Sequence, residues 1–225
     1  MRRFVMALLL SVWSLHAFTQ DSKLRFGLTV SPQLSWMTAG DASLKKNGSY
    51  IGFCYGLLMD LKIPKNYAFS TGIIISYDGG KITYLDSVKF NSLPNNVYPP
   101  GTNVDYRLQY VEIPVTMRLM TNQIGYITYF GQFGLNAAIN IRSRADVSTL
   151  NGTSDETGAN FGDDITPANV GLMVGGGLEY EITGTTALMV GLQFFNGFLD
   201  VTDNPEEYKS KSSMNRLRLT LGVFF

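Results

Sequence analysis

The chain has 225 residues, with 18 basic and 18 acidic side chains, a formal net charge of zero and 45% hydrophobic residues. A neutral chain offers no broad basic face to neutralise phosphates, so no nucleic acid is expected as a partner. After the N-terminus no apolar stretch reaches the roughly 18 residues of a membrane-spanning helix, which argues against a helical membrane protein. The length suits one β domain.

Residues 1–19 have the layout of a secretory signal peptide. Arg2 and Arg3 precede an apolar run from Phe4 to Leu15, and small residues follow at a spacing that a signal peptidase accepts. A short membrane anchor is the alternative, but about 12 apolar residues are too few to cross a bilayer of roughly 30 Å. We therefore expect export, and one mature domain over residues 20–225.

The mature chain would contain a single cysteine, Cys54, and no histidine, because His16 lies in the predicted signal peptide. A single thiol forms no internal disulfide. Without imidazole there is no catalytic triad, no Cys–His pair and no typical zinc site. We therefore expect a protein that is not an enzyme and that carries no metal ion and no other cofactor.

From Leu24 onward, odd and even positions separate by polarity, which is the period of two expected of β-strands. In the first segment, for example, Leu28 and Val30 alternate with Thr29 and Ser31. Eight such segments follow one another, with apolar positions spread over residues 24–36, 51–63, 67–77, 106–119, 129–141, 170–180, 188–198 and 217–225. The predicted fold is all-β, an eight-stranded antiparallel up-and-down transmembrane barrel.

The lengths of the segments and of their connections favour a membrane barrel. The segments exceed the roughly 9 to 11 residues that a tilted transmembrane strand needs. Short connections alternate with long ones, as in outer-membrane barrels. The short ones are residues 64–66, 121–125 and 182–185, and the long ones are residues 38–47, 79–104, 143–167 and 200–213.

The fourth segment changes phase. Tyr106, Leu108 and Tyr110 are apolar at even positions, whereas Val111 and the apolar residues after it are at odd ones. A β-bulge near Tyr110 would explain this slip.

Aromatic residues lie where the strands would meet the two membrane interfaces, which predicts two aromatic girdles. Those near the short turns are Tyr67, Phe69, Tyr126, Tyr180 and Phe225, and those near the long loops are Trp36, Tyr50, Tyr77, Tyr106 and Phe198.

One face of the strands is bulky and almost free of charge, and the other carries the charged residues. A soluble, lipocalin-like barrel would place its apolar face inside. In a membrane barrel the apolar face contacts lipid and the charges point inward, where buried charges need partners. The expected interior charge network consists of Arg25, Asp60, Glu112, Arg118, Arg142, Glu179, Glu181, Arg216 and Arg218.

Glu179 and Glu181 also allow a second interpretation. Two residues apart on one strand, their carboxylates would be about 6 to 7 Å apart, and such a pair could act as acid and base. We favour ion pairing with the interior arginines, because an unpaired buried carboxylate is costly.

Three stretches resemble landmarks of PorT-like outer-membrane β-barrel proteins: Leu108–Pro114, Val170–Tyr180 and the terminal Leu221–Phe225. This resemblance covers nearly the whole mature chain. It implies an eight-stranded barrel in the cell outer membrane, inserted into lipid by the barrel-assembly machinery, with the terminal Phe225 as the assembly signal. For the founding member it also implies a part in the secretion of surface proteins. Most relatives have no assigned activity, so this role does not follow automatically from the resemblance.

Two functions therefore remain open for the chain. The leading hypothesis is a non-enzymatic outer-membrane barrel that is structural or accessory to surface-protein secretion, with a partner protein at the long external loops, above all at residues 79–104. The alternative is a narrow-pore transporter or binder of a small polar solute, motivated by the interior arginines. An eight-stranded barrel is filled by side chains, which disfavours a general porin.

Overall fold

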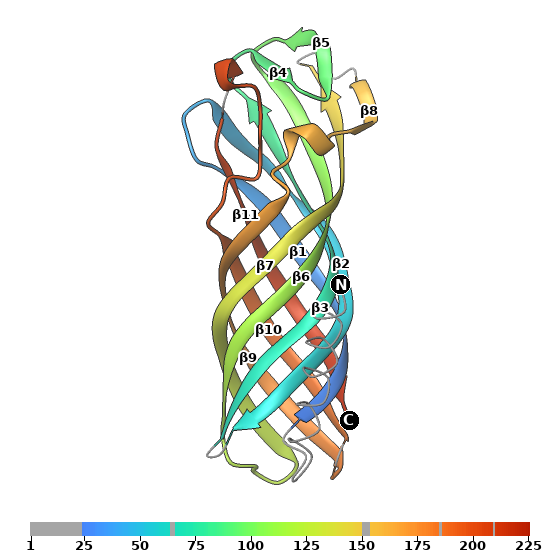
Figure 1. Ribbon diagram of the computed structural model, residues 1–225, viewed down its shortest axis with the longest axis vertical. Helices are drawn as coiled ribbons and strands as arrows, with labels where there is room; N and C mark the ends of the chain where they lie inside the picture. The colour runs from blue at the N-terminus through green and yellow to red at the C-terminus, as the bar shows by residue number, and fades with distance from the viewer. Residues whose placement is uncertain (1–23, 64–65, 150–153, 185, 209) are drawn as a thin grey trace, which may run out of the picture.

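The computed structural model describes residues 24–63, 66–149, 154–184, 186–208 and 210–225 (Figure 1), so the predicted signal peptide lies outside the described residues. Within them, eight strands each pair antiparallel with the next along the chain, and the last pairs with the first. These strands are β1 (Leu24–Ala39), β2 (Leu44–Ile63), β3 (Tyr67–Tyr84), β6 (Thr102–Met120), β7 (Ile127–Ser148), β9 (Ala168–Thr183), β10 (Thr186–Gly197) and β11 (Ser212–Phe224). The predicted eight-stranded up-and-down barrel is confirmed.

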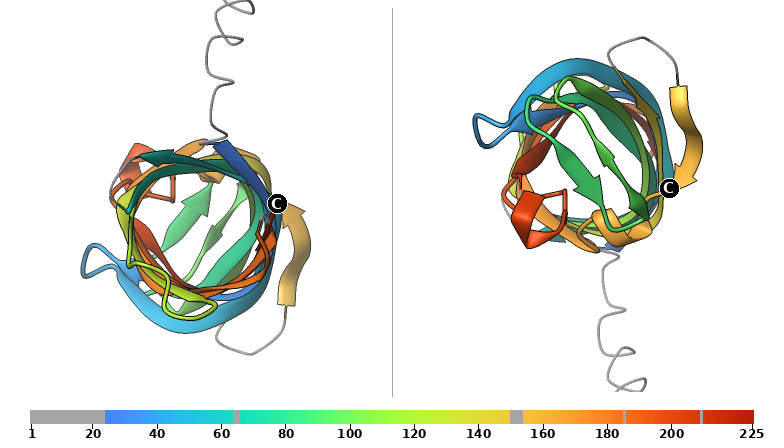
Figure 2. Two further views of the ribbon diagram at one scale, coloured as in Figure 1. Left: turned by 90° about the horizontal axis from the view of Figure 1, so that it is seen from below. Right: turned by 90° about the horizontal axis from the view of Figure 1, so that it is seen from above.

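The remaining elements lie at the long-loop end. β4 (Val88–Phe90) and β5 (Leu93–Tyr98) form a hairpin that lies across the mouth of the barrel, and β8 (Ser154–Asn160) pairs with the end of β7 at the side (Figure 2). Two short 3-10 helices, η2 (Gly162–Asp164) and η3 (Glu206–Tyr208), lie in the last two loops. Within the described residues, no helix has the length and apolar character needed to cross a membrane.

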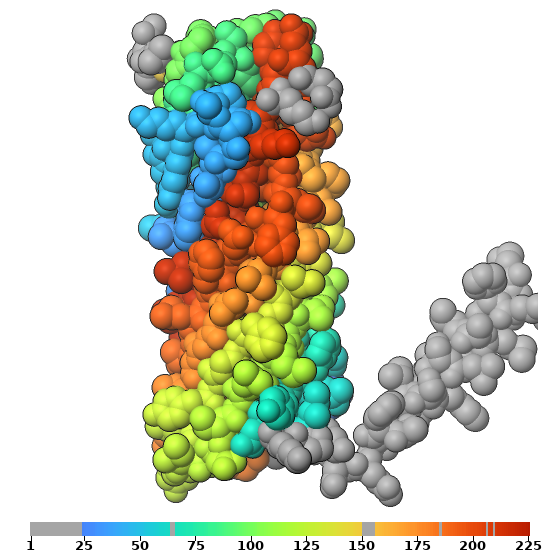
Figure 3. All heavy atoms as spheres, turned by 90° about the vertical axis from the view of Figure 1, so that its left-hand side faces the viewer, coloured from blue at the N-terminus to red at the C-terminus, as the bar shows by residue number. Residues whose placement is uncertain are grey.

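The two faces of the barrel wall have opposite polarity. Outward side chains are apolar and exposed, and Ile51, Leu28 and Leu192 are 82%, 54% and 57% exposed. The inward Gln33 and Ser35, by contrast, are 3% and 0% exposed. This arrangement is the reverse of a soluble barrel, because the apolar side chains of the wall face outward. Figure 3 shows one outer face of the barrel, an elongated cylinder with the long-loop end at the top.

The strands continue where long loops were expected. β1 runs to Ala39 and β2 begins at Leu44, so only four residues connect them, and β7 continues to Ser148. β3 and β6 remain paired up to Tyr84 and Thr102. At these strand ends the polarity of the two faces is reversed, with polar side chains outward and apolar side chains inward. The sequence pattern of a lipid-facing strand therefore does not extend into them. The barrel therefore projects beyond its apolar outer band.

The expected bulge lies at the predicted level but in the neighbouring strand. Gln109 pairs with Arg142 and Tyr110 with Asn140, so Ile141 of β7 is the extra residue. β6 itself keeps one phase, and its even positions from Thr102 to Arg118 all point inward. The apparent slip in β6 has another cause. At the long-loop end the inward residues, such as Tyr106 and Leu108, are apolar, whereas nearer the short turns the inward residues are polar and the outward ones are apolar.

An apolar cluster fills the interior at the long-loop end, and we call it the apolar cap. It joins barrel strands to the β4–β5 hairpin and to the last two loops. Its larger members are Met37, Ile82, Tyr84, Phe90, Tyr98, Tyr106, Leu108, Tyr110, Phe161 and Met214. Tyr106 was expected in the outer aromatic girdle, and this was wrong, because it is 1% exposed and packs inside the cap.

Candidate functional site in the barrel interior

Four charged residues meet in the lumen nearest the short turns, and we call them the short-turn cluster. Arg25 Nη1 lies 2.6 Å from Glu179 Oε2, and its Nη2 lies 2.9 Å from Asp60 Oδ2. Arg118 Nη1 reaches the same two carboxylates at 2.6 Å and 2.9 Å. Because these residues come from β1, β2, β6 and β9, the cluster ties four strands of the wall together across the lumen.

A second group, the central cluster, lies one level further into the barrel and consists of Asp78, Glu112, Arg216 and Arg218. Arg216 Nη1 lies 2.9 Å from Asp78 Oδ2 and also pairs with Glu112. Arg218 Nη2 lies 3.0 Å from Glu112 Oε1. Asn136 Nδ2 donates a further hydrogen bond of 2.8 Å to Glu112 Oε2.

Aromatic rings cover the flat faces of three of these guanidinium groups. Arg25 lies 4.1 Å from the centroid of Phe224, Arg118 lies 4.0 Å from that of Phe130, and Arg216 lies 4.0 Å from that of Phe195. A guanidinium group binds carboxylates at its edge and a ring at its face, so both surfaces are used. The three rings were not among the predicted interior residues. Their inward positions in the alternating pattern of each strand were the signal that could have found them.

Each cluster contains two arginines and two carboxylates, so each is neutral as a unit. Such pairing is needed to offset desolvation, because an unpaired ion in the interior destabilises the fold by several kcal/mol. Two cavities within the lumen, one beside Arg118 and one beside Arg216 and Arg218, measure about 20 and 10 Å³, which is too small for a solute. In the described structure the two clusters therefore fill the lumen.

The apolar cap closes the long-loop end through hydrogen bonds as well as packing. Asp164 of η2 accepts hydrogen bonds from the backbone N–H groups of Asn91 and Ser92, at 2.6 and 2.8 Å, and so holds the turn of the β4–β5 hairpin. Burial raises the pKa of Asp164. Inside the cap, the hydroxyls of Tyr84 and Tyr106 lie 2.7 Å apart.

The structure brings seven of the nine predicted network residues into the two clusters, together with Asp78. Asp78 was recognisable as an inward position of its segment but was not included. Arg142 differs from the expectation: it is exposed on the outer face, because the extra residue Ile141 reverses the phase of β7. Glu181 lies at the short-turn mouth, outside both clusters.

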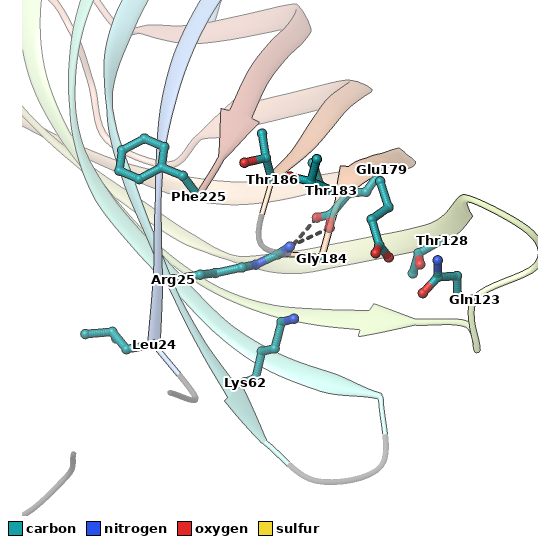
Figure 4. Close-up of a pocket in the computed structure, with 12 residues that line it drawn as sticks. Leu24, Arg25, Lys62, Gln123, Thr128, Glu179, Thr183, Gly184, Thr186 and Phe225 are labelled. Atoms are coloured by element: carbon teal, nitrogen blue, oxygen red, sulfur yellow. Dashed lines mark hydrogen bonds and ion pairs between the residues drawn. The ribbon is translucent and has the colours of Figure 1, made fainter. Parts of the chain in front are cut away.

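That mouth contains a pocket of about 240 Å³, shown in Figure 4. Its floor is the Arg25–Glu179 ion pair, and Lys62, Thr128 and Glu181 contribute to its rim. Glu179 forms the ion pairs that we favoured over an acid–base pair, because both Arg25 and Arg118 bind it, whereas Glu181 lines the open mouth.

Two further residues singled out in the sequence, Cys54 and Phe225, lie outside both clusters. Cys54 is buried in the wall of β2 as a free thiol. Phe225 is 56% exposed at the outer edge, and its backbone exchanges hydrogen bonds with Phe26. Within the described residues, no group of three or more His, Cys, Asp or Glu side chains is placed to hold a metal ion.

Comparison with known proteins places the chain in a family. None of the curated proteins compared with it matches. Among solved structures it is similar to Neisserial surface protein A (15% identity, covering 88% of this chain and 95% of that one, TM-score 0.47). It is also similar to OprG from Pseudomonas aeruginosa (9%, 90% and 94%, TM-score 0.44) and to Ail of Yersinia pestis (14%, 89% and 98%, TM-score 0.37). Similarities at this level assign no function. Residues 18–223, however, match the model of one family, so this chain belongs to the outer membrane protein beta-barrel domain family and is an outer-membrane β-barrel protein.

Proposed function

We propose that this barrel is neither an enzyme nor an open pore, and that it acts through the surface that its apolar cap and loops present outside the cell. In outer-membrane barrels the short turns face the periplasm and the longer connections face outward. This orientation places the pocket at Arg25 in the periplasm and the β4–β5 hairpin on the cell surface. The role that we propose for this surface is binding a protein partner, as an accessory to surface-protein secretion.

The filled lumen is the observation that carries this proposal. Glu112 on β6 and Arg218 on β11 meet from opposite sides of the ring, and the short-turn cluster forms a second closure below them. The apolar cap forms a third closure. A narrow transporter would have to break several buried ion pairs for each passage, and losing one partner of such a pair costs about 3–5 kcal/mol.

The carboxylates of the interior support the non-enzymatic part of the proposal. A general base needs an available lone pair within reach of a substrate. Asp60, Asp78, Glu112 and Glu179 all accept hydrogen bonds or ion pairs from arginines. Asp60, Asp78 and Glu112 are also almost completely buried, which keeps a substrate away from them. Glu179 lies at the floor of the short-turn pocket, but Arg25 and Arg118 bind its carboxylate oxygens.

The cap has the properties of a rigid binding surface. Barrel strands support it from below, and the hairpin is anchored to η2 through Asp164. The outer side of the β4–β5 hairpin, which covers the cap, includes Val97, 58% exposed on β5. An ordered surface that presents apolar and polar groups loses little conformational entropy on binding a partner.

The test compares two properties of the protein. The purified wild-type barrel should give no discrete conductance in planar bilayers. A deletion strain should lose part of its secreted surface proteins, and the wild-type gene should restore them. Because Tyr84 pairs directly with Thr102, residues 86–100 can be replaced by a short Gly-Ser link that removes only the hairpin.

We expect the hairpin-deleted barrel to fold, as shown by a heat-dependent shift in gel mobility, and to fail in restoring secretion. Discrete conductance of the wild type would overturn the closed-lumen part of the proposal. Full restoration by the hairpin-deleted barrel would overturn the proposed role of the cap.

A further inference from the structure

Three arginines lie together on the outer face of the barrel where its apolar band ends, and we call them the basic patch: Arg107 of β6 and Arg142 and Arg144 of β7. All three are exposed. Immediately before them on β7 are Ile139 and Ile141, which are 57% and 52% exposed on the same outer face. The wall therefore changes from lipid-facing isoleucine to arginine within one residue.

The β-bulge produces this abrupt change. Ile141 has no partner in β6, so Ile141 and Arg142 both point outward although they are neighbours in sequence. Bulges of this kind re-aim side chains and are typical of barrel rims and functional sites. Without the bulge, Arg142 would point into the lumen, as its sequence position suggested.

The basic patch brings three arginines together, and Arg142 and Arg144 also line a neighbouring hollow whose other walls include the acidic Asp163. Arg107 and Arg144 are directly opposite each other across β6 and β7, a placement that is unfavourable for like charges. Arg107 pairs with Asp146 at 2.5 Å. None of the ion pairs found among the described residues involves Arg142 or Arg144. By contrast, Lys81 and Asp105 nearby neutralise each other.

The arginines line a hollow of about 220 Å³ whose other walls include Tyr50, Tyr77 and Gln109, with no acidic residue among them. Gln109 Nε2 donates a hydrogen bond of 3.1 Å to the Tyr77 hydroxyl, and the Tyr77 ring stacks on Phe53 at 4.6 Å. Tyrosines at the edge of an apolar band lie at the level of lipid headgroups. The hollow is thus placed at the depth of the outer-leaflet headgroups.

We propose that the basic patch binds the phosphate of a lipid headgroup in the outer leaflet. Guanidinium groups match phosphate oxygens with paired, charge-assisted hydrogen bonds. A phosphate at this point would also remove the repulsion between Arg107 and Arg144. The lipid chains would then lie along the apolar wall beneath Ile141. This site is independent of the partner surface proposed for the cap.

The experiment uses the full-length protein in vesicles that contain lipid A, a glycolipid with phosphorylated sugars, or its dephosphorylated form. The lipid that stays bound to the protein after detergent extraction is quantified by native mass spectrometry. The wild type should retain phosphorylated lipid and not the dephosphorylated form. In R142Q/R144Q, retention should fall at least about tenfold, because the variant loses the charge-assisted hydrogen bonds between guanidinium and phosphate.

A matched control removes two positive charges from the same side of the membrane, at Lys45 and Lys211, both exposed and outside the basic patch. K45Q/K211Q should retain lipid as the wild type does. R142K/R144K preserves the charge and should retain an intermediate amount, and the heat-dependent gel shift shows that each variant is folded. Free inorganic phosphate should not compete at concentrations comparable to the lipid.

Equal retention by R142Q/R144Q and K45Q/K211Q would overturn the proposal. So would equal retention of the phosphorylated and dephosphorylated lipids by the wild type. Displacement by free phosphate would identify the patch as a general anion site instead of a lipid site. None of these outcomes depends on the secretion or conductance measurements, so this proposal and the proposed function fail separately.

Discussion

Arg218 on β11 binds both carboxylate oxygens of Glu112 on β6, with Nη2 3.0 Å from Oε1 and 3.1 Å from Oε2. The two strands lie on opposite sides of the eight-stranded ring, so this contact crosses the lumen. Glu112 also pairs with Arg216 and accepts a hydrogen bond from Asn136. One carboxylate on β6 therefore connects to β11 across the lumen and to the neighbouring strand β7.

Substituting this carboxylate should destabilise the barrel strongly. Glu112→Gln leaves the buried Arg218 without its charge partner, and such a loss costs about 3–5 kcal/mol of unfolding free energy. Urea unfolding of the protein in detergent micelles measures it. The control is Asp105→Asn in the exposed pair with Lys81, which should cost about 0–1 kcal/mol. Equal losses in the two variants would contradict the structural importance of Glu112.

Substitutions of the last two residues, Phe224 and Phe225, should affect stability differently, because the two side chains lie on opposite faces of the wall. Phe224 is 1% exposed and stacks on Arg25, so Phe224→Ala should cost about 3–5 kcal/mol in unfolding free energy. Phe225 is 56% exposed, so Phe225→Ala should destabilise the folded barrel less. If Phe225 is the assembly signal, its variant should instead reduce the amount of barrel inserted in cells. A normal inserted amount would remove that role.

The Asp164 carboxylate should control the order of the β4–β5 hairpin. Asp164→Asn leaves one acceptor oxygen for two backbone N–H groups, and an unpaired buried donor costs about 1–3 kcal/mol. We expect faster cleavage of the hairpin in limited proteolysis, with the heat-dependent gel shift unchanged. The neighbouring Asp163→Asn, at an exposed position, should leave the cleavage rate as in the wild type.

Acidification should loosen the connection between β1 and β2. Burial opposes the charged form of Asp41, but hydrogen bonds from Ser43 and from the Lys211 backbone outweigh it and lower the pKa of Asp41 below 3.8. The carboxylate thus contributes stability that is fully present above pH 3.8 and is lost as the pH falls through the lowered pKa. The Lys211 backbone amide, whose nitrogen lies 2.7 Å from Asp41 Oδ2, should lose protection against hydrogen exchange in that window. In Asp41→Asn this pH dependence should disappear.

The sequence by itself determined the barrel, the number of its strands and the direction of its faces. A period of two places successive side chains on opposite sides, and a bulky uncharged face opposite a charged one is stable only with lipid outside. Arg25, Asp60, Glu112 and Arg118 could therefore be assigned to the interior without coordinates. For the same reason the interior aromatic residues were visible as inward positions, although their stacking on arginines was not.

Only the tertiary structure decided which charges meet, how the lumen is closed, and where along the strands the apolar residues point inward instead of toward lipid. Partners such as Glu112 and Arg218 are separated by 106 positions, and the pairing depends on the ring order and the strand register. Above the apolar band the inward side chains become apolar, so the rule that assigned apolar residues to lipid placed Tyr106 on the wrong face. One extra residue, Ile141, moved Arg142 from the lumen to the surface, because a single added position reverses the facing of every residue that follows it.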